Sequence, residues 1–211
     1  MTPSVRAPTA NEPGAAHDAA IRVASDAVST TPAEIKTDNP ISVESVDLKS
    51  IVKPMLAREL FKLEPTRAQA YFANIAALQP QPSDESWEQT YRGTSKQPWL
   101  DSVLIELAEV DGRWGLGQSQ ITWRPPKAQA RALYDRLVAE VQRARGRKPD
   151  FGEDESEGGK QQRFAGWSWC KDACQAIVAL DSNGRMSIDS PSQIDQNRPA
   201  VLLKVFTPEG P

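Results

Sequence analysis

A chain of 211 residues is long enough for one domain of ordinary size with an appendage. Its formal net charge of −3 argues against bulk electrostatic attraction to nucleic acid or to an anionic membrane surface. The single histidine, His17, lies in a stretch without aromatic residues, which excludes Ser–His–Asp and Cys–His catalysis from the predicted folded part. With two cysteines besides, neither a metal site nor a cofactor is predicted.

The first part of the chain lacks the residues that build a core. The six Trp, three Tyr and five Phe residues all follow position 60, and the early segment is rich in Ala, Pro, Thr and Ser. Such a segment cannot bury enough apolar surface to offset its ordering entropy, so residues 1–45 are predicted to be a disordered tail or tether. No secretory signal and no apolar run that could span a membrane are visible. The chain as written is expected to be cytoplasmic, or periplasmic or secreted if a signal was removed or export follows another route.

Residues 46–80 are predicted to be a helical segment outside the main domain. Apolar residues recur at a spacing near 3.6 over 47–63 and again over 65–79, which favours two helices with one apolar face. Pro54 is expected in a first helical turn, where its missing N–H costs nothing. The apolar face of residues 51–79 would need a partner, and it is a candidate for docking or for a homo-oligomer contact.

Residues 85–211 are predicted to be an α+β domain. A strand over 100–110 is rich in β-branched and aliphatic residues, and Asp111-Gly112 suits a type I′ turn into a return strand over 113–123. Glycines at 115 and 117 indicate a bulge or a close backbone approach in that return strand.

A long helix is expected to begin after Pro125-Pro126 and to end near Gly146. Its outer face offers two pairs four residues apart, Arg131–Asp135 and Arg136–Glu140. Its apolar positions are Ala130, Leu133, Tyr134, Leu137, Val141 and Ala144.

The acidic, glycine-rich residues 150–162 are interpreted as a loop. Further strands are expected over 164–169, 175–180 and 201–206, and Asn183-Gly184 is typical of a turn into another strand over 186–190, followed by a polar loop over 191–199. The fold class is therefore α+β. A mostly antiparallel sheet of about five strands in β-β-α-β-β-β order is covered by one long helix, after the helical pair and the disordered tail.

Six tryptophans follow residue 86, which is more indole than one small core needs. Trp114, Trp123, Trp167 and Trp169 are the predicted binding surface. Trp167 and Trp169 alternate along a strand and so share a face. The alternative for these two, which the usual burial of large aromatic residues favours, is packing in the core under the helix.

Cys170 and Cys174 are the two cysteines, separated by three residues that suit a tight turn. A small structural disulfide is predicted because the two sulfur atoms could come within bonding distance. Free thiols are the alternative, and a redox or metal role is a further one, although the spacing is not the one of CxxC redox motifs.

These patterns favour a non-enzymatic binding module that recognises a protein, or a component of the cell envelope, through a tryptophan-rich surface. Bacterial accessory or toxin-neutralising proteins have this character by analogy alone. A carboxylate- or thiol-dependent enzyme or delivered effector is the alternative, and a structural subunit of a larger assembly is another. A protein partner is expected, and nucleic acid and a membrane span are not.

Overall fold

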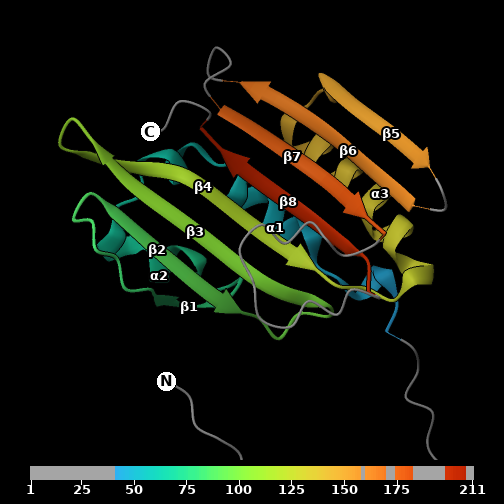
Figure 1. Cartoon of the computed structure of the whole chain (residues 1–211), viewed down its shortest axis with the longest axis horizontal. Coiled ribbons are helices and arrows are strands. Elements are labelled where there is room, and N and C mark those ends of the chain that lie inside the picture. Colours follow the sequence, from blue (N-terminus) through green and yellow to red (C-terminus); the bar gives the residue numbers. More distant parts are fainter. Residues whose placement is uncertain (1–40, 158–159, 170–173, 183–197, 208–211) are drawn as a thin grey trace, which may run out of the picture. The chain divides into compact units, whose positions relative to one another are not determined.

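An eight-stranded antiparallel sheet forms the centre of the protein, with the strand order β1-β2-β3-β4-β8-β7-β6-β5 (Figure 1). The computed structural model describes residues 41–157, 160–169, 174–182 and 198–207. The strands are β1 (Ala77–Pro80), β2 (Glu88–Thr94), β3 (Leu100–Val110), β4 (Arg113–Trp123), β5 (Phe151–Glu157), β6 (Lys160–Trp169), β7 (Cys174–Asp181) and β8 (Ala200–Phe206). The predicted α+β class is confirmed, but the sheet is larger than the five strands expected.

The helices of the described residues lie on one face of this sheet, behind it in Figure 1. They are α1 (Leu48–Met55), α2 (Pro65–Phe72) and α3 (Lys127–Arg145), with 3-10 helices η1 (Val43–Ser45) and η2 (Arg58–Lys62). The long helix α3 contacts β7 and β8, and η2 contacts β4. The opposite face carries no helix among the described residues, and none of the described helices combines the length and apolarity needed to cross a membrane.

Two of the unexpected strands are the edges of the sheet. The prediction of a loop over 150–162 is wrong, because β5 pairs with β6 along its length, from Phe151↔Gly166 to Glu157↔Lys160. The helix predicted over 65–79 ends at Phe72, and β1 follows it. Edge strands tolerate charged and polar residues because one of their sides faces solvent, so their sequences lack the apolar alternation of central strands.

The helical segment shares one hydrophobic core with the sheet, which corrects the prediction of an apolar face outside the main domain. Ile51, Leu60 and Phe72 have no exposed surface and belong to the same buried cluster as Ile121 of β4 and Leu133 of α3. These apolar side chains are therefore already covered, and they offer no docking face to a second copy.

Pro54 lies in the last turn of α1 rather than in a first turn as expected. Its carbonyl accepts a hydrogen bond of 2.8 Å from the Tyr71 hydroxyl, and the Tyr91 hydroxyl donates to the Pro65 carbonyl at 2.7 Å. Tyr71 thus connects α2 to α1, and Tyr91 connects the sheet to the start of α2.

The β3–β4 hairpin forms as predicted. Asp111 and Gly112 have φ values of 53° and 72°, the left-handed conformation that a type I′ turn requires at both central positions. The pairing passes from Glu106↔Gln118 to Leu107↔Leu116, which leaves Gly117 as the extra residue of a bulge.

Helix α3 also matches its prediction closely. It ends at Gly146, which has a left-handed φ of 69°, and Arg131 pairs with Asp135 at 2.8 Å. Ala144 is exposed, contrary to expectation. The buried positions are Ala130, Leu133, Tyr134, Leu137 and Val141.

The second predicted pair on α3 does not form. Arg136 instead donates to the backbone carbonyl of Val43, and Glu140 pairs with Arg143. Arg136 thus holds η1 against α3, which explains why an arginine on the outer face of this helix is partly buried.

Strands β7 and β8 are direct neighbours, with Asp181 opposite Ala200. The predicted turn at Asn183-Gly184, the strand over 186–190 and most of the loop over 191–199 lie outside the described residues. Residues 1–40 of the predicted tail lie outside them as well.

Leu60→Ala tests whether the helical segment and the sheet share one core. Because Leu60 is fully buried in η2, the truncation is expected to lower the free energy of unfolding by about 2–5 kcal/mol, measured by urea denaturation. The neighbouring exposed Glu59→Ala is the control and should stay within about 0.5 kcal/mol of the parent. Equal stability of the two variants would contradict a shared core.

Candidate functional site

Two of the four predicted surface tryptophans are in the core. Trp123 and Trp167 have no exposed surface, and the Trp167 indole donates to the Arg147 carbonyl at 3.2 Å. Neither side chain can contact a partner in this conformation. Any tryptophan-lined surface therefore has to be built from Trp114 and Trp169, which are partly exposed.

Trp169, the last residue of β6, lies between an aromatic ring and a guanidinium. The ring of Phe61 meets it edge to face, with the ring centroids 5.8 Å apart and an interplanar angle of 82°. The Cζ atom of Arg145 lies 4.2 Å from the centroid of the same indole, which is cation–π geometry. The side chains come from η2, β6 and the end of α3, so three separate elements build this stack.

Trp114 lines a surface hollow of about 850 Å³ near this stack. Phe61, Lys62 and the hairpin residues 110–115 also line it. Phe61 contacts Trp169 and lines the hollow, so it connects the two tryptophans. The register places both at the end of the sheet where β4 begins and β6 ends (Figure 1). We call the hollow at Phe61 and Trp114, together with the stack of Trp169 and Arg145 that adjoins it through Phe61, the aromatic groove.

The aromatic groove lies in a positive environment. Burial lowers the pKa of Arg145, and the charges of Arg147 and Arg58 lower it further, while Asp150 opposes them. Burial is the main cause, and the added effect of Arg147 and Arg58 reflects two further guanidinium groups near Arg145. Lys62 and Arg113 add positive charge at the hollow, where Glu64 and Asp111 are the acidic residues.

A hydrogen-bonded clasp holds the strand that carries Trp169. The Asp150 carboxylate accepts a hydrogen bond of 2.7 Å from the Ser168 backbone N–H and one of 2.8 Å from Arg147. Arg147 also donates to the Ser168 carbonyl. The Ser168 N–H, and then Arg147, lower the pKa of the Asp150 carboxyl below its usual range. The clasp fixes the backbone at Ser168. It thereby also positions the neighbouring Trp167 and Trp169, whose side chains lie on the other face of the strand.

Cys174 is opposite Trp169 in the β6–β7 pairing. It is buried and disulfide-bonded. Its predicted partner, Cys170, lies outside the described residues, so the pairing of the two stays a prediction. A bond between them would join Cys174 covalently to the residue that follows Trp169 in the sequence.

Sequence reasoning found Trp114 and Trp169 but missed Phe61 and Arg145. Arg145 belongs to the basic run at the end of α3, and such runs are common because cations favour the negative end of the helix dipole. The signal available for Phe61 was the apolar periodicity over 47–63, which described a helix face and gave no hint of contact with residue 169.

Among the residues of the four described segments, no group of three or more His, Cys, Asp or Glu side chains is placed to hold a metal ion. No protein-family model, curated protein or solved structure matches the chain.

Asp150→Asn is expected to lower stability at neutral pH and to lose this effect in acid. The folded state holds the Asp150 pKa below that of the unfolded chain, so the stabilisation is present above about pH 4 and disappears as the pH falls through the folded-state pKa. Urea unfolding of the variant and of the parent at pH 7 and in acid measures the difference.

The exposed Asp84→Asn is the control for the loss of a surface charge. A stability difference for Asp150→Asn that is the same at both pH values would show that the clasp does not depend on the ionised carboxylate.

Mass spectrometry tests the predicted Cys170–Cys174 bond. The unreduced chain is expected to be lighter by two hydrogens than the reduced chain and to resist alkylation in denaturant, because both sulfurs are bonded. The same denatured chain after reduction is the control and should take up two alkyl groups. Alkylation without reductant would contradict the bond.

Proposed function

We propose that the protein is a non-enzymatic binding module that holds an acidic, partly apolar segment of another protein in the aromatic groove. The observation that carries this proposal is the state of Arg145. Its guanidinium lies on the Trp169 ring, yet it makes no hydrogen bond or ion pair with any described residue, and its Nε is buried. An arginine prefers to satisfy its fork of N–H donors, and a carboxylate does this with two parallel hydrogen bonds.

The stack lowers the entropic cost of such binding. Trp169 is held by Phe61 on one side and by the clasp at Ser168, and Arg145 lies on the indole. Side chains that are already ordered lose little freedom when a partner binds. Tryptophan and arginine are also the residue types that most often dominate binding energy at protein interfaces.

The charge of the surroundings favours an acidic partner. Arg58 and Arg147 act on Arg145 and outnumber the opposing Asp150, whereas Lys62 and Arg113 at the hollow are matched by Glu64 and Asp111. The excess of positive charge is therefore at Arg145, where it attracts carboxylates in the approach and disfavours basic partners. The hollow then accepts an apolar or aromatic side chain of the same segment against Phe61 and Trp114.

Selection of displayed random peptides on the full-length protein tests the proposal. Enriched peptides are expected to combine Asp or Glu with an aromatic residue. The tightest of them should bind about tenfold or more weakly to Arg145→Gln and to Trp114→Ala, because each variant removes one of the two anchors.

Trp87→Ala is the matched control, because Trp87 is half exposed and lies outside the aromatic groove. It should bind the peptide as the parent does. Enrichment of neutral or basic peptides, or equal losses in all three variants, would refute the proposal.

A further inference from the structure

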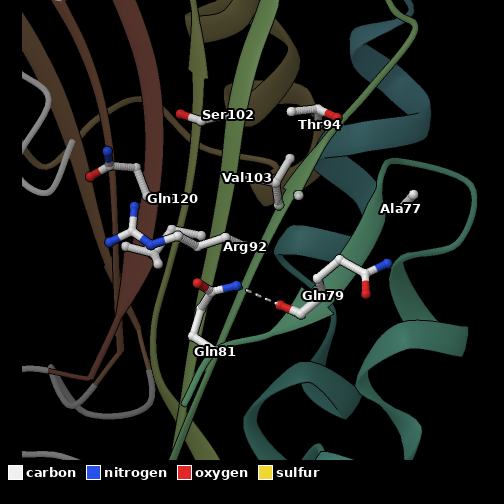
Figure 2. Close-up of a pocket in the computed structure, with 10 residues that line it drawn as sticks. Ala77, Gln79, Gln81, Arg92, Thr94, Ser102, Val103 and Gln120 are labelled. Atoms are coloured by element: carbon white, nitrogen blue, oxygen red, sulfur yellow. Dashed lines mark hydrogen bonds between the residues drawn. The ribbon is translucent and has the colours of Figure 1, made fainter. Parts of the chain in front are cut away.

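We infer a second binding site on the opposite, helix-free face of the sheet, where Arg92 takes a small carboxylate ligand. The site is a hollow of about 390 Å³ across β1, β2, β3 and β4 (Figure 2). This volume is at the lower end of the range for small-molecule sites. The site is independent of the aromatic groove.

Strand alternation places the side chains of this hollow on the helix-free face. Val103, Ile105 and Leu107 of β3 point into the core, so Ser102 and Leu104 face the other way. Leu104 is buried but is not part of the core cluster.

The pairing register then builds a row across the sheet. Gln79 is opposite Arg92, Arg92 is opposite Leu104, and Leu104 is opposite Gln120. Paired residues of antiparallel strands share a face, so these four side chains lie side by side. Leu104 supplies an apolar floor between Arg92 and the Gln120 amide, and Figure 2 shows the guanidinium close to that amide.

Arg92 has no ion-pair partner in the part of the chain that the structure describes. Its side chain is exposed and makes no hydrogen bond or ion pair with any described residue. None of the described residues that line the hollow is acidic. A guanidinium that faces a hollow with no carboxylate favours an anionic ligand.

The neighbouring groups specify the kind of anion. Gln120 is 7% exposed, and its Nε2 donates to the Thr122 hydroxyl at 3.3 Å, while its Oε1 has no partner among the described residues. This amide oxygen can accept a hydrogen bond from a ligand O–H or N–H.

The ligand therefore carries a carboxylate for Arg92 and a hydrogen-bond donor beside it for Gln120. One cation suits a single negative charge, whereas phosphate sites usually gather several donors, often at a helix N-terminus. Two sources share this chemistry: a small hydroxycarboxylate and the carboxyl end of a peptide, whose last N–H is next to the carboxylate.

Titrations of the nitrogen-15-labelled full chain distinguish these sources. The probes are glycolate, N-acetylglycylglycine and its amide, and the readout is the side-chain N–H signals of Arg92 and Gln120. One of the two carboxylates is expected to shift both signals and to bind about tenfold more tightly than the amide, because only the carboxylate makes charge-assisted hydrogen bonds. The tighter of the two identifies the source.

Two variants and one control complete the test. Arg92→Gln removes the cation and should weaken binding about tenfold or more, and Gln120→Glu places a competing carboxylate beside Arg92 and should do the same. Lys127→Gln removes an exposed cation at the start of α3, outside both proposed sites, and should change nothing. Absence of shifts with both carboxylates, equal binding of the amide, or undiminished binding by Arg92→Gln would overturn the inference.

Discussion

The pairing of β4 with β8 is the contact on which the rest of the structure depends. Six residue pairs, from Gln118↔Phe206 to Trp123↔Val201, join two four-stranded meanders into one sheet. The first meander follows α1 and α2, and the second follows α3 alone. Each half thus places four strands after its helical part, with the last strand at the centre of the sheet. Two half-sheets alone would each expose the unpaired backbone N–H and C=O groups of a long edge strand, and the central pairing removes both edges at once. It also brings the two halves' helices to one face, where they share a core.

The sequence predicted those parts of the fold whose signals are local. The Asp111-Gly112 turn, the bulge near Gly117 and the extent of α3 follow from turn chemistry and helical periodicity, which act over a few residues. The sheet edges could not be predicted this way, because solvent covers one side of β5 and removes the need for apolar alternation. The joining of β4 to β8 is a contact between residues far apart in the chain, and no local pattern specifies it.

Only part of the candidate site could be predicted, because the contacts that build it also join residues far apart in the chain. The surplus of tryptophan pointed to an exposed aromatic surface, and Trp114 and Trp169 do reach the surface, but Trp123 and Trp167 are buried. A large sheet with a single core takes up more indole than the five-stranded sheet expected from sequence. Arg145 became visible as a site residue only in three dimensions, because its stacking on Trp169 depends on where α3 ends relative to β6.

The two edges of the sheet are protected in different ways. At β1, the Gln69 amide of α2 donates to the Leu78 carbonyl at 2.9 Å, and Pro80 has no N–H to offer, so this edge is blocked by shape and by used hydrogen bonds. At β5, the exposed acidic residues Glu153 and Asp154 would meet like charges if two copies came together at this edge. Ions in solution screen the charge repulsion at β5, but they do not affect the blocked backbone groups at β1. Pairing between the sheets of two copies would therefore depend on ionic strength and would involve the β5 edges only. It would stop at two copies, because the β1 edge of each copy remains blocked.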